Sequence, residues 1–160
     1  FQLGDLVETA DGLGTVKEIS LTFTKLETPD GLWLMTPNSV LSSGKITNYT
    51  ALGRRRAEIR VGASYDAAVS DVRAACLDAA ARVPGVLPDP APIVYVDSYG
   101  ESSISYIVRV WCRSEDYTDV YYGLTEGLKA AFDEHGVEMP YNHLNIHILD
   151  QTEQKEKQTV

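Results

Sequence analysis

The sequence contains no long hydrophobic run. Over its 160 residues, no window approaches the roughly 18 to 20 consecutive apolar residues that a membrane-spanning helix requires. A cationic, apolar leader is also missing, and the first residue is Phe1 rather than Met. We therefore expect that nothing in this sequence crosses a bilayer and that the chain begins in the middle of a longer protein.

Positive charge is scarce as well. The chain carries 14 Lys and Arg against 23 Asp and Glu, a formal net charge of −9 at pH 7. Attraction to nucleic acid arises largely when Lys and Arg replace the counterions of phosphates, so an acidic chain is a poor phosphate binder. The composition therefore argues against nucleic acid as a partner, and mildly against binding flat on anionic lipid.

Cysteine is also rare in this sequence. The two cysteines, Cys76 and Cys112, lie in segments with apolar periodicity. This placement favours buried, reduced side chains of a cytosolic protein over a disulfide or part of a metal site. No Ser/His/Asp or Cys/His set has a supporting motif, so the sequence predicts neither an enzyme nor a cofactor.

Residues 1–50 alternate polar and apolar side chains between tight turns, which predicts five short strands in a small open β-barrel. We interpret Gly12, Gly14 and Gly31 as turn residues with positive φ, because a phosphate-binding glycine loop would need a helix after it. Pro37-Asn38 is interpreted as the end of a strand. So small a barrel has little core of its own and should need partners.

The remainder of the chain divides into three parts. Residues 51–56 interrupt the alternation with a glycine and three arginines, and we interpret them as a linker. Residues 57–149 follow the order β-α-β-β-α-β, the split βαβ arrangement of ferredoxin-like α+β folds. Residues 150–160 are polar and are expected to form a mobile tail.

Two helices and a last strand are expected within the second unit. Asp66 is a natural N-cap for the first helix, and Gly136 stands where a left-handed cap would end the second, over residues 117–135. A final strand is expected over residues 144–149. The second helix has an apolar face at helical spacing, formed by Val120, Leu124, Leu128, Ala131 and Phe132.

A series of short motifs occurs in fixed order along residues 1–149. None of them is specific alone, but together the series resembles the cytosolic part of the small-conductance mechanosensitive channel (MscS) family. In the first unit the motifs are Phe1-x-x-Gly4-Asp5-x-Val7, Gly12-x-Gly14-Thr15-Val16, Thr24-x-Leu26-x-Thr28-x-Asp30-Gly31 and Pro37-Asn38-Ser39. In the second they include Gly62-x-Ser64-Tyr65-Asp66, Val86-Leu87-x-Asp89-Pro90-Ala91-Pro92, Val108-Arg109-Val110-Trp111 and Pro140-Tyr141.

The resemblance implies a homoheptameric membrane protein that releases ions and small solutes after osmotic shock. The first unit would be an Sm-like, SH3-like barrel beneath the cell membrane, and the ferredoxin-like unit would form the wall of a cytoplasmic chamber. Ions and solutes would pass through gaps between subunits, and the last strands would join in an axial barrel. The pore and the tension sensor would be membrane helices that this chain lacks, so its role would be assembly, solute filtering and coupling to the gate.

The basic run Arg54, Arg55 and Arg56 has two interpretations. It is either a solvated linker or a cationic collar that meets lipid headgroups or attracts anions at a chamber opening. The sequence alone does not separate them.

Gly123 and Gly127 are unexpected inside a predicted helix, where each glycine costs about 1 kcal/mol relative to Ala. They are four residues apart and share a face. We hypothesise that this face allows a close subunit contact; the alternative is neutral variation on an exposed surface.

His143, Asn145 and His147 alternate with apolar residues in the expected last strand. No carboxylate or cysteine joins them at metal-ligand spacing, so no metal site is predicted. In an axial barrel, one of the two strand faces would line the bore. If that face is the polar one, His147 would form a ring whose charge changes near pH ~6–7.

Two other classes of function were weighed against the channel. An RNA-binding module is the first, because Sm-like and ferredoxin-like folds both host RNA sites. The net charge and the lack of an RNP1-type aromatic strand argue against it. A free-standing scaffold is the second.

Overall fold

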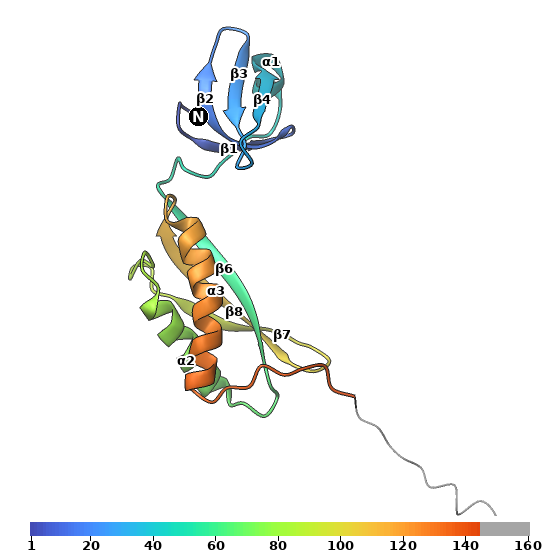
Figure 1. The fold of residues 1–160 in the computed structure, drawn as a ribbon, viewed down its shortest axis with the longest axis vertical. Coiled ribbons are helices and arrows are strands. Elements are labelled where there is room, and N and C mark those ends of the chain that lie inside the picture. The colour runs from blue at the N-terminus through green and yellow to red at the C-terminus, as the bar shows by residue number, and fades with distance from the viewer. Residues whose placement is uncertain (145–160) are drawn as a thin grey trace, which may run out of the picture.

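The computed structural model describes residues 1–144, which form two antiparallel sheets and three helices (Figure 1). We call residues 1–49, with the first sheet, the β unit. Residues 54–144, with the second sheet, are the α/β unit. Residues 50–53 form the junction between them.

The sheet of the β unit has the strand order β4-β3-β2-β1-β5, and all its neighbouring strands are antiparallel. A short helix, α1, follows β4 and packs beside it. The bounds are β1 Leu6–Thr9, β2 Gly12–Ile19, β3 Phe23–Glu27, β4 Trp33–Pro37, α1 Asn38–Ser43 and β5 Thr47–Asn48.

The core of the β unit is small. Val7, Val16 and Leu26 are fully buried and form one cluster, against which the half-buried Leu34 and Ile46 pack. Each of the three comes from a different strand, β1, β2 or β3. Along each strand, inward side chains alternate with outward ones. Only a modest hydrophobic stabilisation can come from so few side chains.

Two of the expected turn glycines have backbone angles that favour glycine. Gly12 has a φ of 140° and Gly31 a φ of 78°. Gly14 differs from the expectation, because it lies inside β2 without a positive φ. A Cβ at Gly14 would lie 2.8 Å from Leu26 Cβ and 3.0 Å from the Glu27 carbonyl oxygen. Its role is to let β3 approach closely, not to turn the chain.

Asn38, the first residue of α1, connects three parts of the β unit. Its side-chain oxygen accepts a hydrogen bond of 2.8 Å from the hydroxyl of Thr24, which is 1% exposed. Its amide group donates to the carbonyl oxygens of Ser20 and Leu21, at 2.9 and 3.2 Å. The Pro37-Asn38 pair therefore does more than end β4, because Asn38 also holds the β2–β3 turn against α1.

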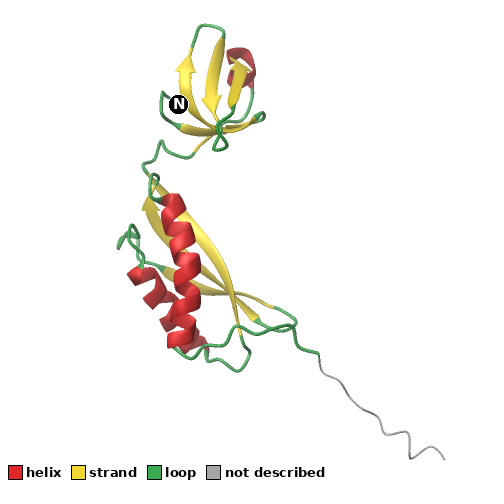
Figure 2. Cartoon of the chain, in the orientation of Figure 1, coloured by secondary structure: helices red, strands yellow, loops and turns green. Residues whose placement is uncertain are grey.

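The α/β unit contains a three-stranded sheet with the order β6-β8-β7, covered on one face by both of its described helices (Figure 2). The helices and the inward side chains of the strands share one core of twenty buried residues, which includes Tyr106, Leu124 and Phe132. The bounds are β6 Arg54–Ala63, α2 Val69–Arg82, β7 Ile93–Tyr99, β8 Ile104–Arg113 and α3 Tyr117–Glu134.

The structure confirms the predicted fold class, an antiparallel β unit followed by an α+β unit. The predicted apolar face of α3 is buried at all five positions. Gly136 has a φ of 66°, as expected of a left-handed residue after a helix. The described residues contain the β-α-β-β-α part of the predicted order; Asn145 to Leu149 of the expected last strand and residues 150–160 lie outside them.

Two expectations about the start of this unit were wrong. Arg54, Arg55 and Arg56 are not linker residues, because β6 begins at Arg54 and pairs with β8 from there. Asp66 does not cap α2, which begins at Val69. A turn intervenes, in which the Ala67 N–H donates to the Ser64 carbonyl and the Asp66 N–H to the Ser64 hydroxyl.

Both cysteines are buried and free, as predicted. Cys76 lies in α2 and Cys112 in β8, and both belong to the core of the α/β unit. Burial raises the pKa of the Cys76 thiol to about 12. The pKa of Cys112 is raised as well, mainly by burial. Both thiols therefore stay protonated and unreactive at neutral pH.

Replacing Gly14 with Ala should destabilise the protein by about 1–3 kcal/mol, the usual cost of overpacking, because the new methyl group would overlap Leu26 and Glu27. Gly127→Ala is the matched control, since a Cβ there meets nothing closer than 3.8 Å. Helix propensity predicts a gain of up to about 1 kcal/mol for that control. Chemical denaturation compares the two variants, and a Gly14→Ala protein as stable as the wild type would contradict the close approach of β3.

Replacing Asn38 with Ala should cost about 1–3 kcal/mol, because it leaves the buried Thr24 hydroxyl without a partner. The double variant Thr24→Val with Asn38→Ala should recover part of this loss, since both members of the hydrogen bond are then removed. Urea denaturation of the two single variants and the double variant measures the coupling. If the stability lost in the double variant equals the sum of the losses in the two single variants, the Thr24–Asn38 hydrogen bond does not contribute to stability.

Candidate functional site

The arginine run lies where the two units meet, and each arginine has a partner in its own chain. Arg54 places its guanidinium carbon 5.1 Å from the ring centroid of Trp111 in β8. Arg56 forms an ion pair of 3.5 Å with Glu58. Glu58 also pairs with Arg109 on the outward face of the sheet. Arg54 and Arg56 are exposed, so of the three they are the residues that could attract anions or headgroups.

Arg55 has a different environment from its neighbours. Its guanidinium carbon is 3.5 Å from the ring centroid of Tyr117, the first residue of α3. It is also 4.7 Å from the ring centroid of Tyr49, at the end of the β unit. Arg55 is half-buried, and its cation interacts with one aromatic ring from each unit.

Tyr49 is held by the β unit. Its N–H donates to the carbonyl oxygen of Leu6 at 2.9 Å, and its hydroxyl donates to Glu8 at 2.5 Å. The hydrogen bond to Glu8, assisted by burial, raises the pKa of Tyr49. The ring therefore remains neutral at physiological pH, and β1 determines its position.

The junction is a hydrogen-bonded turn. The Asp5 carboxylate accepts bonds from the Gln2 N–H, the Asn48 amide and the Thr50 hydroxyl at 2.8 to 2.9 Å. These bonds, that of Gln2 first, lower the pKa of Asp5. The Gly53 N–H donates to the Thr50 carbonyl at 2.8 Å, and Gly53 has a φ of 67°. Thr50 and Ala51 are thus hydrogen-bonded back onto the β unit, through Asp5 and Asn48.

Ser114 provides a second connection between the units. It follows β8, and its hydroxyl donates to the Tyr49 carbonyl oxygen at 3.1 Å. Its N–H donates to the Gly53 carbonyl oxygen, also at 3.1 Å. Two attachments therefore cross the junction: hydrogen bonds at Ser114 and a cation–aromatic stack at Arg55.

Gly123 and Gly127 pack against the end of α2 within the same chain. A Cβ on Gly123 would lie 3.4 Å from a Val83 methyl group, and one on Gly127 would lie 3.8 Å from the other. The two glycines line a groove of about 460 Å³ between α2 and α3, together with Ala79 and Pro84. Both distances are ordinary van der Waals contacts, so packing within the chain does not require glycine at these two positions. A subunit contact at this groove stays a hypothesis.

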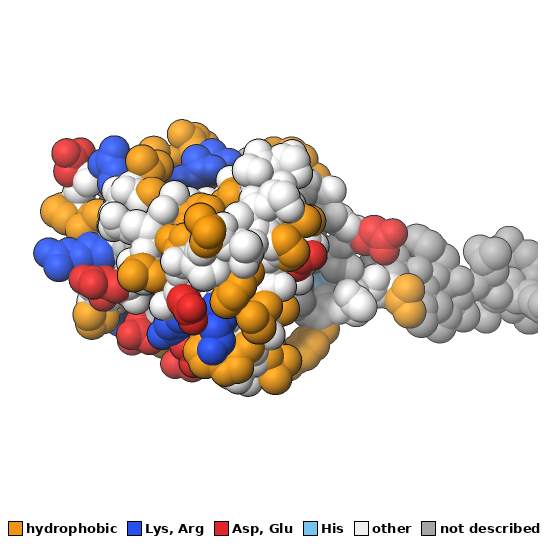
Figure 3. All heavy atoms as spheres, turned by 90° about the horizontal axis from the view of Figure 1, so that it is seen from above, with side chains coloured by type: hydrophobic (Ala, Val, Ile, Leu, Met, Phe, Trp, Pro, Cys, Tyr) orange, Lys and Arg blue, Asp and Glu red, His pale blue; other side chains and the backbone are white. Residues whose placement is uncertain are grey.

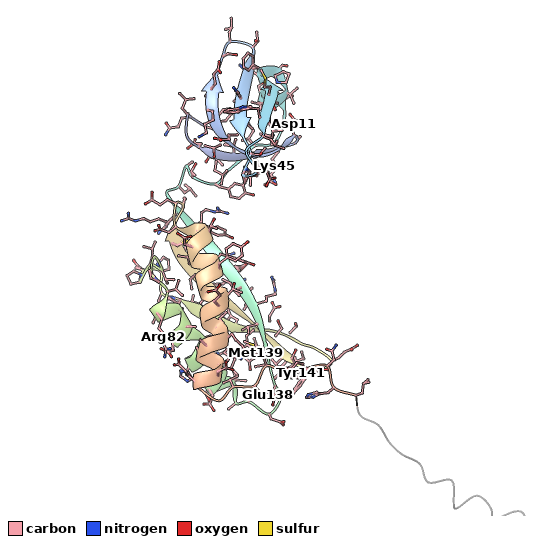
Figure 4. The ribbon with its side chains drawn as sticks, in the orientation of Figure 1. Asp11, Lys45, Arg82, Glu138, Met139 and Tyr141 are labelled. Atoms are coloured by element: carbon pink, nitrogen blue, oxygen red, sulfur yellow. The ribbon has the colours of Figure 1, made fainter. Side chains whose placement is uncertain are left out.

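A charged network closes the end of this groove. Arg82, labelled in Figure 4, lies 2.5 Å from Asp78 and 2.7 Å from Glu134 of α3. His135 Nε2 lies 3.0 Å from the Asp78 carboxylate. The bond to His135 is the main reason that the pKa of Asp78 is lowered, and the bond to Glu134 is the main reason that the pKa of Arg82 is raised. The network ties the C-terminal ends of α2 and α3 together.

Of the residues predicted for the axial barrel, the structure describes only His143. His143 is exposed, and its N–H donates to the Ser102 hydroxyl at 3.0 Å. Asn145 and His147 lie outside the described residues. Within residues 1–144, no group of three or more His, Cys, Asp or Glu side chains is arranged to hold a metal ion.

The surface of the β unit carries many large apolar side chains. Leu21, in the β2–β3 turn, is 97% exposed. Leu32, just before β4, and Trp33 and Met35 in β4 are mostly exposed too. Figure 3, which looks at the molecule from above, shows hydrophobic side chains spread among charged ones. Among the described residues, no helix is long and apolar enough to cross a membrane.

Sequence reasoning found the arginine run but missed its partners. Glu8, Tyr49 and the pair Ser114 and Tyr117 lie far apart in sequence, so no local pattern connects them. The one signal in the sequence was that the arginine run follows Tyr49 closely. That arrangement is common on protein surfaces and does not indicate a contact.

Two family models match the chain, one for each unit. The model described as "Mechanosensitive ion channel, beta-domain" matches residues 1–51. The model described as "Mechanosensitive ion channel MscS, C-terminal" matches residues 57–139.

Relatives and solved structures agree with these matches. The small-conductance mechanosensitive channel of Edwardsiella ictaluri is 30% identical over 148 residues, which are 92% of this chain and 52% of the relative. The crystal structure of Helicobacter pylori MscS in a closed state has a TM-score of 0.87 and 28% identity, covering 94% of this chain and 60% of that one. Arabidopsis thaliana MSL1, at 19% identity and a TM-score of 0.72, shares the fold over 88% of this chain and 53% of its own.

The chain spans about half the length of the curated relatives it matches. Both family models match in the order in which the two units occur along the chain, and the larger match alone covers more than half of the 160 residues. The chain therefore belongs to the MscS family of mechanosensitive ion channels.

Proposed function

We propose that this chain is the cytoplasmic vestibule of a tension-gated channel that releases ions and small solutes after osmotic shock. The observation that carries the proposal is the similarity of both units, in the same order, to H. pylori MscS. Because the two matching family models describe the beta-domain and the C-terminal region, we assign the chain to the vestibule. The roles proposed for it are assembly, solute filtering and coupling to the gate.

Assembly from identical copies is supported by the physical character of the β unit. Its core cluster has three buried side chains, while Trp33 and Met35 of β4 are mostly exposed. An edge strand with exposed apolar residues is usually covered in the functional protein. We propose a ring of copies, with seven as the expected number, whose contacts cover this surface.

The charge of the chain supports a channel over RNA binding. Its net charge is −9, and Glu58, Asp97 and Glu115 pair with arginines of the sheet of the α/β unit. A polyanion would therefore have to compete with these carboxylates for the paired arginines. RNA binding has no observation in its favour beyond the fold class.

The direct test is electrical. The complete gene product containing this chain, made in cells that lack their own mechanosensitive channels, should give current in membrane patches when suction is applied. It should also raise survival after osmotic downshift. Patches that stay silent until they rupture would contradict the proposal, and tight, salt-sensitive RNA binding by the purified chain would favour the alternative.

A core variant links this function to the β unit. Leu26→Ala removes a fully buried side chain and should cost about 2–5 kcal/mol, enough to abolish assembly and current. Leu52→Ala is the matched control for folding, because Leu52 is 86% exposed and its loss should leave the melting temperature unchanged. Normal current from a Leu26→Ala protein would show that the β unit is not needed for the channel.

A further inference from the structure

Arg55 occupies a position between two rings that belong to different units. Its guanidinium carbon lies 4.7 Å from the ring centroid of Tyr49 in the β unit and 3.5 Å from that of Tyr117 in the α/β unit. We propose that Arg55 is a positioning residue that fixes the orientation of the β unit relative to the α/β unit.

Each of the two rings is anchored in its own unit. Tyr49 is bound to β1 through its N–H and to Glu8 through its hydroxyl. Tyr117 begins α3, whose apolar face is buried in the core of the α/β unit, and its ring stacks on Tyr121 one turn later with centroids 6.1 Å apart. A group that contacts both rings therefore contacts two rigid bodies.

The backbone of Arg55 is anchored as well. Arg55 pairs with Cys112 in the β6–β8 ladder. Its carbonyl oxygen accepts a contact of 3.7 Å from the Cys112 sulfur, which is buried. The base of the side chain thus moves with the α/β unit, and only the guanidinium reaches the β unit.

The hydrogen bonds of Ser114 would not fix the orientation alone. Only one of them reaches the β unit, at the Tyr49 carbonyl oxygen, because the other ends on Gly53 of the junction. A single point of attachment leaves rotation about that point free, whereas a second attachment removes it. The contact of the Arg55 guanidinium with the Tyr49 ring is that second attachment. It acts on the side chain of Tyr49, whereas Ser114 binds the Tyr49 carbonyl oxygen.

Arginine is suited to this position for a geometric reason. Its guanidinium is planar and presents two faces to aromatic rings, whereas the ammonium of Lys is a compact charge without a plane. The role assigned to Arg55 therefore differs from that of Arg54 and Arg56, which are exposed and whose partners, Trp111 and Glu58, belong to their own unit.

The inference does not depend on the proposed channel function. If the chain is part of a channel, Arg55 is the residue through which a rotation of the β unit would turn the α/β unit. If it is not, the orientation of the two units is still fixed in the same way, so the test below addresses the chain alone.

The test is a distance measurement between the units by pulsed electron paramagnetic resonance. Spin labels are attached at Ser42→Cys in α1 and Glu126→Cys in α3, both exposed positions, while the buried Cys76 and Cys112 stay unlabelled. Labelled chains are diluted with unlabelled chains, so that only distances within one chain are recorded. The wild-type background should give one narrow distance distribution.

Arg55→Lys and Arg55→Gln should both broaden this distribution, although Lys keeps the charge. Arg54→Lys is the matched control and should leave it narrow, because Arg54 and Trp111 belong to the same unit. Tyr49→Leu, which removes one ring and leaves the α/β unit untouched, should broaden it as well. Circular dichroism verifies that each variant is folded. A distribution that stays narrow in folded Arg55→Gln and Tyr49→Leu proteins would overturn the proposal, as would equal broadening by Arg54→Lys.

Discussion

The small hydrophobic core of the β unit is the constraint on which the rest of the structure depends. Val7, Val16 and Leu26 form its buried cluster, and such a cluster is weak support for a unit of about fifty residues. Hydrogen bonds of its buried polar side chains, Asp5, Thr24 and Thr36, therefore carry part of the fold. Thr24 is paired with Asn38, Thr36 with Asp11, and Asp5 with Asn48. Each of these bonds joins segments that are distant in sequence, which is why the unit holds its shape with little apolar packing.

The α/β unit has the opposite balance. Its core cluster of twenty buried residues includes large side chains from β8 and from both helices, among them Tyr106, Leu124 and Phe132. This larger body gives β6 a rigid base that extends to the junction. Arg55, the second residue of β6, can hold the weaker β unit because its own backbone belongs to the stronger one. The two units are thus mechanically unequal, and the junction transmits orientation from one to the other.

Much of this architecture could be predicted from the sequence, because its signals are local. The helical spacing of Val120, Leu124 and Leu128 predicts the buried face of α3, and the structure confirms it. Cap and boundary predictions were less successful. Asp66 resembles a helix cap, but the hydrogen bonds of Ser64 form a turn there and delay the helix. The arginines of β6 resemble a linker because charged residues are common in linkers, yet their backbone pairs with β8.

The rest of the site could not be predicted, because it depends on contacts between distant segments. Gly14 resembles a turn glycine until β3 is placed against it, and only then does the short distance to Leu26 explain it. Arg55 resembles its two neighbours in sequence, and it differs from them because its guanidinium contacts the rings of both Tyr49 and Tyr117. Residues that touch across the junction have no fixed spacing, so no motif describes them.

The central claim is that the β unit, with its small core and exposed apolar strand, is stable as a member of a ring of identical copies. Multi-angle light scattering of the purified chain tests this directly. The account predicts a molar mass several times the 17.6 kDa of one chain, close to seven copies, that falls toward the monomer on dilution. A folded protein with the mass of a single chain at every concentration would contradict it.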